Sequence, residues 1–133
     1  MGLTVFATRF GYNPLRNLMY ALNFYTDLYG DVLRNNRKTA TIRLGDKSSK
    51  YRTGMIVWIT IGPRFGRRQK LFSAILDRVE VKRVGELSPR DIEREGPELR
   101  NQDDVIEVLS RIYGDLVTPQ NTVTVIYFSR VDE

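Results

Sequence analysis

The stretch from Lys70 to Arg83 constrains the fold of this chain more than any other part of the sequence. Every second residue in it is apolar, at Phe72, Ala74 and Leu76 and, after a change of phase, at Val79 and Val81. Such alternation is typical of a β-strand that turns one face toward a protein core. The change of phase predicts a bulge or a bend between Leu76 and Val79. The chain is therefore expected to build its core on a sheet that includes this long strand.

Further strands are predicted where β-branched and apolar residues gather, at Leu3–Ala7, Thr39–Leu44, Met55–Ile61 and Val123–Val131. The almost continuously apolar Met55–Ile61 predicts a strand buried on both faces, with Trp58 in the core. The strands do not alternate with helices in a βαβ rhythm, which argues against a parallel sheet. The sequence favours an α+β fold, a small β-barrel with flanking short helices.

Helices are predicted from apolar spacing and from capping residues. The first begins at Asn13-Pro14, continues with helical spacing through Leu22 to Val32, and ends near Asn36, since Asn tolerates the left-handed conformation that ends helices. A short helix follows Ser88 as its cap and ends before Gly96. Another helix spans Val105–Tyr113 and is closed by Gly114.

Residue types that are absent restrict the chemistry. The 133 residues include neither Cys nor His, which removes disulfides, thiol catalysis and the usual general base. A metal site would need carboxylates alone, and no metal or cofactor is predicted. The length predicts one domain, residues 1–133. With no apolar run long enough to span a bilayer and no signal-peptide pattern, a cytoplasmic protein without a membrane partner is expected.

Charge is unevenly distributed along the chain. Residues 1–83 contain 16 Lys/Arg and 5 Asp/Glu, a net charge of +11, whereas residues 84–133 contain 5 and 11, a net charge of −6. A basic surface formed by the first part would attract phosphates. The ordinary alternative is a charged surface with internal ion pairs.

Cations and hydroxyls gather in the segment Arg37–Arg43. In a strand, Thr39, Thr41 and Arg43 share one face, and Lys38 lies on the other unless it belongs to the preceding turn. Lys38, Thr39 and Arg43 are therefore candidate ligand-binding residues for an anionic or polar ligand. An edge strand with polar residues toward water would explain the same pattern.

A second basic group lies between two predicted strands. Its members are Arg64, Phe65, Arg67, Arg68 and Lys70. Cations on a hairpin loop can contact phosphates, and an exposed aromatic ring can stack on a base, so these residues are predicted to bind RNA. A charged hairpin loop without this function is the alternative.

The segment around Lys38 resembles the signature of the ASCH domain family in the PUA-like superfamily. That signature is Gly-x-Lys followed, after four residues, by Arg; Lys38 and Arg43 match it, and Asn36 replaces the Gly. The resemblance extends over roughly residues 20–130, through a helix before the signature, hydrophobic strands after it and the helix capped by Ser88. It implies a PUA-like β-barrel.

The resemblance also implies two functions. Members of the family are proposed to bind RNA in a cleft beside the signature, and small bacterial members deacylate acetylcytidine with a Lys, a Thr and a Glu. These catalytic types fall on Lys38, Thr41 and Glu95. Thr41 would attack the amide carbonyl, Lys38 would shuttle the proton and Glu95 would assist the leaving amine.

The first expectation is therefore RNA or nucleotide binding by a basic cleft. The alternative is a metal-independent amidohydrolase acting on a modified pyrimidine nucleoside, and the sequence leaves open whether the protein is an enzyme. A third option is a protein-interaction module with a protein partner. Both leading functions predict that Lys38, Thr41, Arg43 and Glu95 line one cleft, with Lys38 in the turn before the strand.

Overall fold

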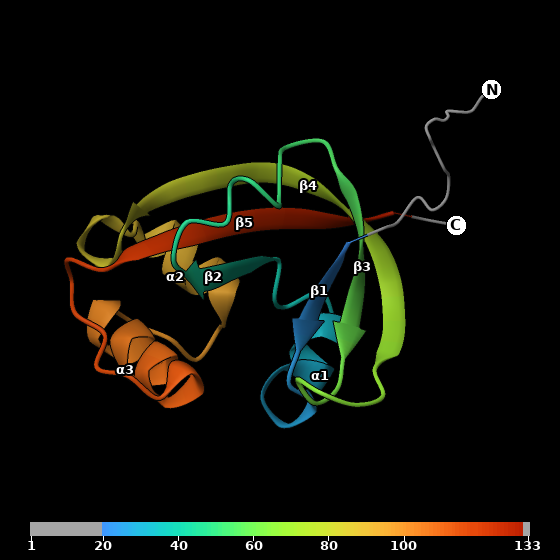
Figure 1. The fold of residues 1–133 in the computed structure, drawn as a ribbon, viewed down its shortest axis with the longest axis horizontal. Helices are drawn as coiled ribbons and strands as arrows, with labels where there is room; N and C mark the ends of the chain where they lie inside the picture. Colours follow the sequence, from blue (N-terminus) through green and yellow to red (C-terminus); the bar gives the residue numbers. More distant parts are fainter. Residues whose placement is uncertain (1–19, 132–133) are drawn as a thin grey trace.

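The computed structural model of the chain describes residues 20–131. In chain order its elements are β1 (Ala21–Phe24), α1 (Thr26–Arg34), β2 (Ala40–Leu44), β3 (Ile56–Ile61), β4 (Gln69–Arg83), the 3-10 turn η1 (Val84–Glu86), α2 (Pro89–Glu95), α3 (Gln102–Tyr113) and β5 (Thr122–Val131). Strands and short helices share one unit, so the α+β prediction is confirmed (Figure 1). The strand and helix start predicted before residue 20 lie outside the described residues.

The five strands form one curved sheet in the order β1-β3-β4-β5-β2, a half-barrel whose long strands β4 and β5 run side by side (Figure 1). Three of its pairings are antiparallel, and β1 pairs parallel with β3. The sheet is therefore mixed. The sequence had argued against a wholly parallel sheet and had not predicted the one parallel pair. The register of β4 against β5 shifts between Leu76 and Arg78, which confirms the predicted bulge.

The prediction of one long first helix from apolar spacing is wrong for residues 21–24. That segment is β1, whose burial alternates so that Leu22 and Phe24 enter the core. Backbone pairing of β1 with the distant β3 overrides the helical spacing. The helix that does form, α1, ends as predicted: Asn36 takes the left-handed conformation with φ 57°.

The two later helices follow their capping residues. The Ser88 hydroxyl accepts a hydrogen bond from Asp91 N, the Asp91 carboxylate accepts one from Ser88 N, and α2 ends before Gly96. Helix α3 ends at Gly114, which is left-handed at φ 77°. These local signals therefore predicted both ends of α2 and the C-terminal end of α3 correctly.

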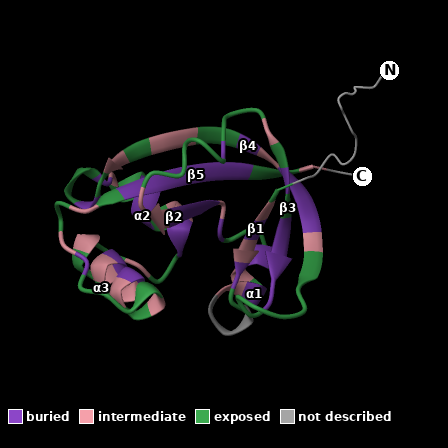
Figure 2. Cartoon of the chain, viewed as in Figure 1, coloured by how far each residue is buried: buried purple, intermediate pink, exposed green. Residues whose placement is uncertain are grey.

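Strand β5 lies between two hydrophobic clusters. Ile126 and Phe128 face the cluster under β1, α1 and β3, whereas Val125 and Tyr127 face the cluster under α2 and α3. Figure 2 shows β5 buried along most of its length. Both clusters thus rest on one strand, and the turn before β2 lies beside their junction.

The prediction that Met55–Ile61 is buried on both faces is wrong, and so is the placement of Trp58 in the core. Val57, Ile59 and Ile61 are buried, but Ile56 is 46% exposed and Trp58 is 42% exposed. Helix α1 contacts β3 from one side, and within residues 20–131 the outer face of β3 remains open. The Lys70 ammonium lies 5.2 Å from the centre of the Trp58 ring on that outer face.

Candidate functional site

Lys38 lies in the turn before β2, as expected from its odd spacing to Thr41. Its side chain is fully buried, and Nζ donates three hydrogen bonds, to Ala40 O at 2.6 Å, Glu95 O at 2.7 Å and Glu95 Oε2 at 2.5 Å. An ammonium group has three N–H donors, so Lys38 has none left over. The ammonium also lies 4.6 Å from the centre of the Tyr29 ring. The buried Lys38 side chain therefore contacts residues of α1, β2 and α2 at once.

Glu95, the last residue of α2, is the acidic partner in this buried group. Its Oε1 accepts a hydrogen bond from Ile42 N at 2.7 Å, and its charge acts on the nearby Tyr29 hydroxyl. Burial and the Glu95 charge raise the pKa of Tyr29 above its usual value, so Tyr29 stays protonated and remains a donor. The carboxylate thus holds the end of α2 against the backbone of β2.

Burial lowers the pKa of Lys38 to about 8, because a desolvated ammonium is disfavoured. The Glu95 carboxylate opposes this shift, and the Arg43 cation adds to it. A lysine that loses its proton near pH 8 has the acidity required of a catalytic base. Its three hydrogen bonds, in contrast, are those of a structural ammonium.

Thr41 and Arg43 form a second contact on β2. Arg43 Nε donates to Thr41 Oγ1 at 2.9 Å, and Arg43 Nη2 donates to Asn23 O at 3.1 Å. The guanidinium lies 4.9 Å from the centre of the Phe24 ring. In the described part of the chain, Thr41 makes no hydrogen bond to Lys38 or Glu95. The four residues of the predicted cleft therefore form two contacting pairs, with Phe24 beside both cations.

Thr41 and Arg43 open into a cavity of about 350 Å³, which we call the β2 cavity. Among the described residues that line it, none is Asp or Glu. Its cationic lining residues are Arg43, Lys47, Lys50, Arg64 and Arg68. Its aromatic ones are Phe24, Tyr25, Tyr29, Tyr51 and Tyr113. The cavity thus combines positive charge with aromatic surface.

The predicted RNA-binding loop meets the β2 cavity only in part. Arg64 and Arg68 line it. Phe65 is 87% exposed at the tip of the loop, with the Arg64 guanidinium 5.4 Å from its ring centre. Arg67 is exposed, and Lys70 belongs to β4 and lies over Trp58. Two of the five predicted residues therefore share a cavity with the signature strand.

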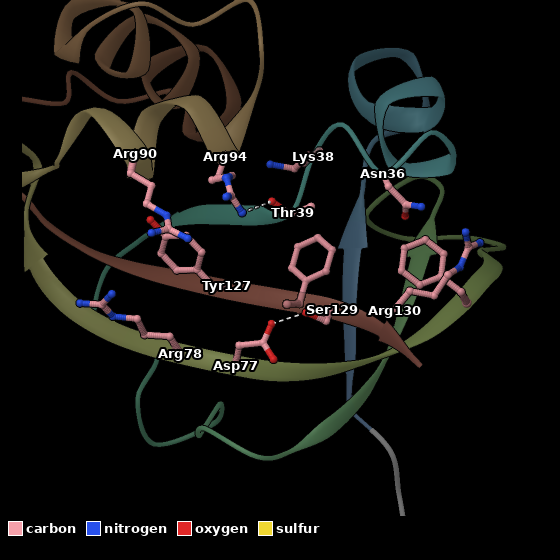
Figure 3. Close-up of a pocket in the computed structure, with 12 residues that line it drawn as sticks. Asn36, Lys38, Thr39, Asp77, Arg78, Arg90, Arg94, Tyr127, Ser129 and Arg130 are labelled. Carbon is pink, nitrogen blue, oxygen red and sulfur yellow. Dashed lines mark hydrogen bonds between the residues drawn. The ribbon is translucent and has the colours of Figure 1, made fainter. Parts of the chain in front are cut away.

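Lys38 and Thr39 line a different cavity, of about 580 Å³, between α2, the turn before β2, and strands β4 and β5 (Figure 3). We call it the arginine cavity after its lining residues Arg78, Arg90, Arg94 and Arg130. Thr39 N donates to Arg94 O at 3.1 Å, and Thr39 Oγ1 accepts a hydrogen bond from Arg94 Nη1 at 3.4 Å. Thr39 precedes β2, so it does not share the face of Thr41 and Arg43 that strand alternation predicted.

Several residues of these cavities were missed by sequence reasoning. Tyr29 lies within the predicted helical spacing that runs to Val32, and that spacing gave no sign that it lines the β2 cavity and interacts with Glu95. Arg90 and Arg94 are spaced i, i+4 on α2, a spacing that places them on one helix face and could have drawn attention to them. Across residues 20–131, no three Asp or Glu side chains gather closely enough to hold a metal ion. No helix in this range is long and apolar enough to cross a bilayer.

Sequence comparison gives no relative: no family sequence model matches the chain, and no curated protein matches it. Comparison of folds gives clear matches at low identity. The ASCH domain from Lactobacillus crispatus JV V101 matches with a TM-score of 0.60 and 13% identity, over 84% of this chain and 79% of that one.

Two further solved structures match the fold. Protein EF3133 from Enterococcus faecalis V583, of the DUF984 family, gives a TM-score of 0.65 at 18% identity, over 96% of this chain and 88% of that one. The hypothetical protein PH0355 gives 0.61 at 14% identity, over 86% of this chain and all of that one. Together with the half-barrel and the three short helices of the described residues, these matches show that the chain has the same fold as the ASCH domain structure.

Proposed function

We propose that the protein binds RNA or a nucleotide in the β2 cavity. The observation that carries this proposal is the charge of the lining: among the side chains that the structure describes, five cationic ones and no carboxylate line a space of about 350 Å³. Phosphate oxygens are the ligand groups that such a lining favours, and the Arg64 guanidinium can form two parallel hydrogen bonds to them. Arg43 and Arg68 add positive charge, although each already donates two hydrogen bonds within the protein. The polar contacts would hold the backbone of the ligand.

Aromatic side chains support a nucleotide over a simple inorganic anion. Tyr25 and Tyr113 line the cavity and are 37% and 38% exposed, so their rings are accessible to a base. Phe65, close along the chain to Arg64 and Arg68, is more exposed still. Stacking of a base on such a ring contributes about 1–3 kcal/mol and accepts any base. A short single strand, whose bases are unpaired, suits this arrangement best.

The second candidate function, after RNA or nucleotide binding, is deacylation of a modified pyrimidine nucleoside such as acetylcytidine. Its support is the contact between Lys38 and Glu95 and the lowered pKa of Lys38, about 8. Against it, the three donors of Lys38 are bound to Ala40 and Glu95, and the Thr41 hydroxyl receives its hydrogen bond from Arg43. Thr41 would need a base within hydrogen-bond reach to act as a nucleophile. The geometry therefore favours binding over hydrolysis.

The binding proposal is tested by anisotropy of a labelled single-stranded RNA over a range of salt concentrations. Lys50→Gln/Arg68→Gln removes two cations of the cavity whose side chains are exposed, so folding should not change. Affinity should fall by at least about tenfold, and the dependence of log K on log salt should lose about 1.4 units of slope, since each phosphate contact on a single strand contributes about 0.7. Arg52→Gln/Arg100→Gln, which removes two exposed cations that line neither cavity, is the charge-matched control.

Equal losses in both double variants would mean that binding follows net charge alone, and the β2 cavity would lose its role. Hydrolysis is tested separately by incubating the protein with acetylcytidine and separating the products by chromatography. Turnover by the wild type that is absent in Thr41→Ala would favour the hydrolase. Equal turnover in the two proteins would exclude Thr41 as the nucleophile.

A further inference from the structure

The arginine cavity gathers cations from three separate elements. Arg90 and Arg94 extend from α2, Arg78 extends from β4, and Arg130 extends from β5 (Figure 3). The cavity measures about 580 Å³, within the range of small-molecule sites. Among the described residues, none lines both this cavity and the β2 cavity. It is therefore a separate basic site.

Most of this positive charge is not neutralised. Arg78 pairs with Glu80. Arg94 reaches only the Thr39 hydroxyl, and Arg130 lies 4.2 Å from the centre of the Phe72 ring. Among the residues that the structure describes, no carboxylate lies within ion-pair distance of Arg90, Arg94 or Arg130. Asp77, the one acidic residue among the described lining residues, accepts a hydrogen bond from Ser129. Like charges gathered in this way repel one another and attract an anion.

The aromatic rings of this cavity are already covered. The Arg130 guanidinium lies over Phe72, and the Arg78 guanidinium lies 6.0 Å from the centre of the Tyr127 ring. The Tyr127 hydroxyl is bound to Asp91 Oδ1 at 2.5 Å, and Phe128 is buried. No ring is left to stack on a base. The cavity thus offers guanidinium groups without an open aromatic face, unlike the β2 cavity.

We propose that the arginine cavity binds a ligand with consecutive phosphate groups. Guanidinium forks match phosphate oxygens in pairs, and Arg90, Arg94 and Arg130 project from different sides of a space that is larger than one phosphate needs. Phosphate groups follow one another directly in free polyphosphates, and they recur along a nucleic-acid backbone with a sugar between each pair. The inference does not depend on the function proposed for the β2 cavity, since the two sites share no residue.

Isothermal titration calorimetry with inorganic tripolyphosphate, and separately with a short oligouridylate, tests this proposal. Arg90→Gln/Arg94→Gln should weaken binding of the ligand that uses the cavity by at least about tenfold, because two charge-assisted hydrogen-bond donors are lost. Arg52→Gln/Arg100→Gln should stay within about twofold of the wild type at the low-salt condition. Because Arg94 is half-buried, Arg130→Gln, at an exposed position, serves as a second variant in case the first unfolds.

Amide shifts of ¹⁵N-labelled protein locate the binding. Shifts at residues 36–39, 90–94 and 127–130 on addition of tripolyphosphate support the proposal with a free phosphate ligand. The same shifts with the oligouridylate alone support it with a nucleic-acid backbone as the source. Shifts confined to residues 41–51 and 64–68 would overturn it, as would unchanged affinity in all arginine-cavity variants. A loss of RNA binding in Lys50→Gln/Arg68→Gln concerns only the β2 cavity, so the two proposals can fail independently.

Discussion

The Lys38 ammonium lies 2.5 Å from Glu95 Oε2 inside the protein, and this contact ties the turn before β2 to the last residue of α2. Only 1% of Lys38 and 5% of Glu95 is exposed. A buried pair of this kind must replace all the hydration that each ion has lost, and the further bonds to Ala40 O, Glu95 O and Ile42 N serve that purpose. The pair therefore positions β2, and with it both candidate cavities.

Glu95→Ala should lower the free energy of unfolding by about 3–5 kcal/mol, because it leaves the Lys38 ammonium buried without its counter-charge. Urea denaturation followed by circular dichroism measures the change. Glu107→Ala, which breaks the exposed pair between Glu107 and Arg111, is the control and should cost less than about 1 kcal/mol. Equal effects of the two substitutions would show that the buried pair is dispensable.

Stability should rise with pH between about 8 and 10 through Lys38. The folded-state pKa of Lys38 is lowered to about 8 from an unfolded value of 10.5, so in this interval the unfolded chain binds the extra proton. Stability rises wherever the unfolded state binds more protons. Above pH 10 the raised pKa of Tyr29 acts in the opposite direction. Urea denaturation at several pH values should show the rise in the wild type and not in Lys38→Met/Glu95→Gln; a flat wild-type profile would contradict it.

Asp91→Asn should reduce stability at neutral pH and have little effect in strong acid. Burial tends to raise the pKa of Asp91, but hydrogen bonds from Tyr127, Ser88 N and Lys82 outweigh it and hold the pKa below its usual 3.8. A lowered carboxyl pKa stabilises the fold above the unfolded value and loses this effect as pH falls through the folded value. The expected loss at pH 7 is about 1–3 kcal/mol, measured by thermal or urea unfolding. A difference that persists unchanged at pH 2 would disagree with this account.

Phe65→Ala should weaken binding of single-stranded RNA by about tenfold, because an exposed ring that stacks on a base contributes about 1–3 kcal/mol. Stability should not change, since the side chain is 87% exposed. Leu116→Ala removes another apolar side chain that is 84% exposed, and it serves as the control in the same anisotropy assay. Equal RNA affinity of the wild type and Phe65→Ala would remove this loop from the interface.

Signals carried by neighbouring residues made part of the fold predictable. The cap at Ser88, the left-handed Asn36 and Gly114, and the phase change after Leu76 each reflect local backbone chemistry, and the structure contains all of them. The helical spacing through Leu22 gave a wrong prediction, because parallel pairing with β3 makes residues 21–24 a strand. Such a pairing depends on residues far along the chain, which local spacing does not report.

The exposure of Trp58 was unpredictable for a related reason. An apolar strand is buried on both faces only where other elements cover both, and coverage depends on how the helices pack. The candidate site shows the same limit. The family resemblance selected Lys38 and Glu95, but the three acceptors around Lys38 come from β2 and α2. The arginines of the second cavity come from α2, β4 and β5, so only the fold brings them together.

The position of β5 between β4 and β2 has a consequence for synthesis of the protein. Ala40 pairs with Tyr127, and Arg83 pairs with Thr122. Strands β2 and β4 therefore both pair with β5, which is synthesised after the other described strands. Until residue 131 has emerged, β2 lacks its partner among the described strands, and both hydrophobic clusters lack their shared strand. Such distant pairings slow folding, and the nascent chain exposes apolar surface that chaperones can recognise.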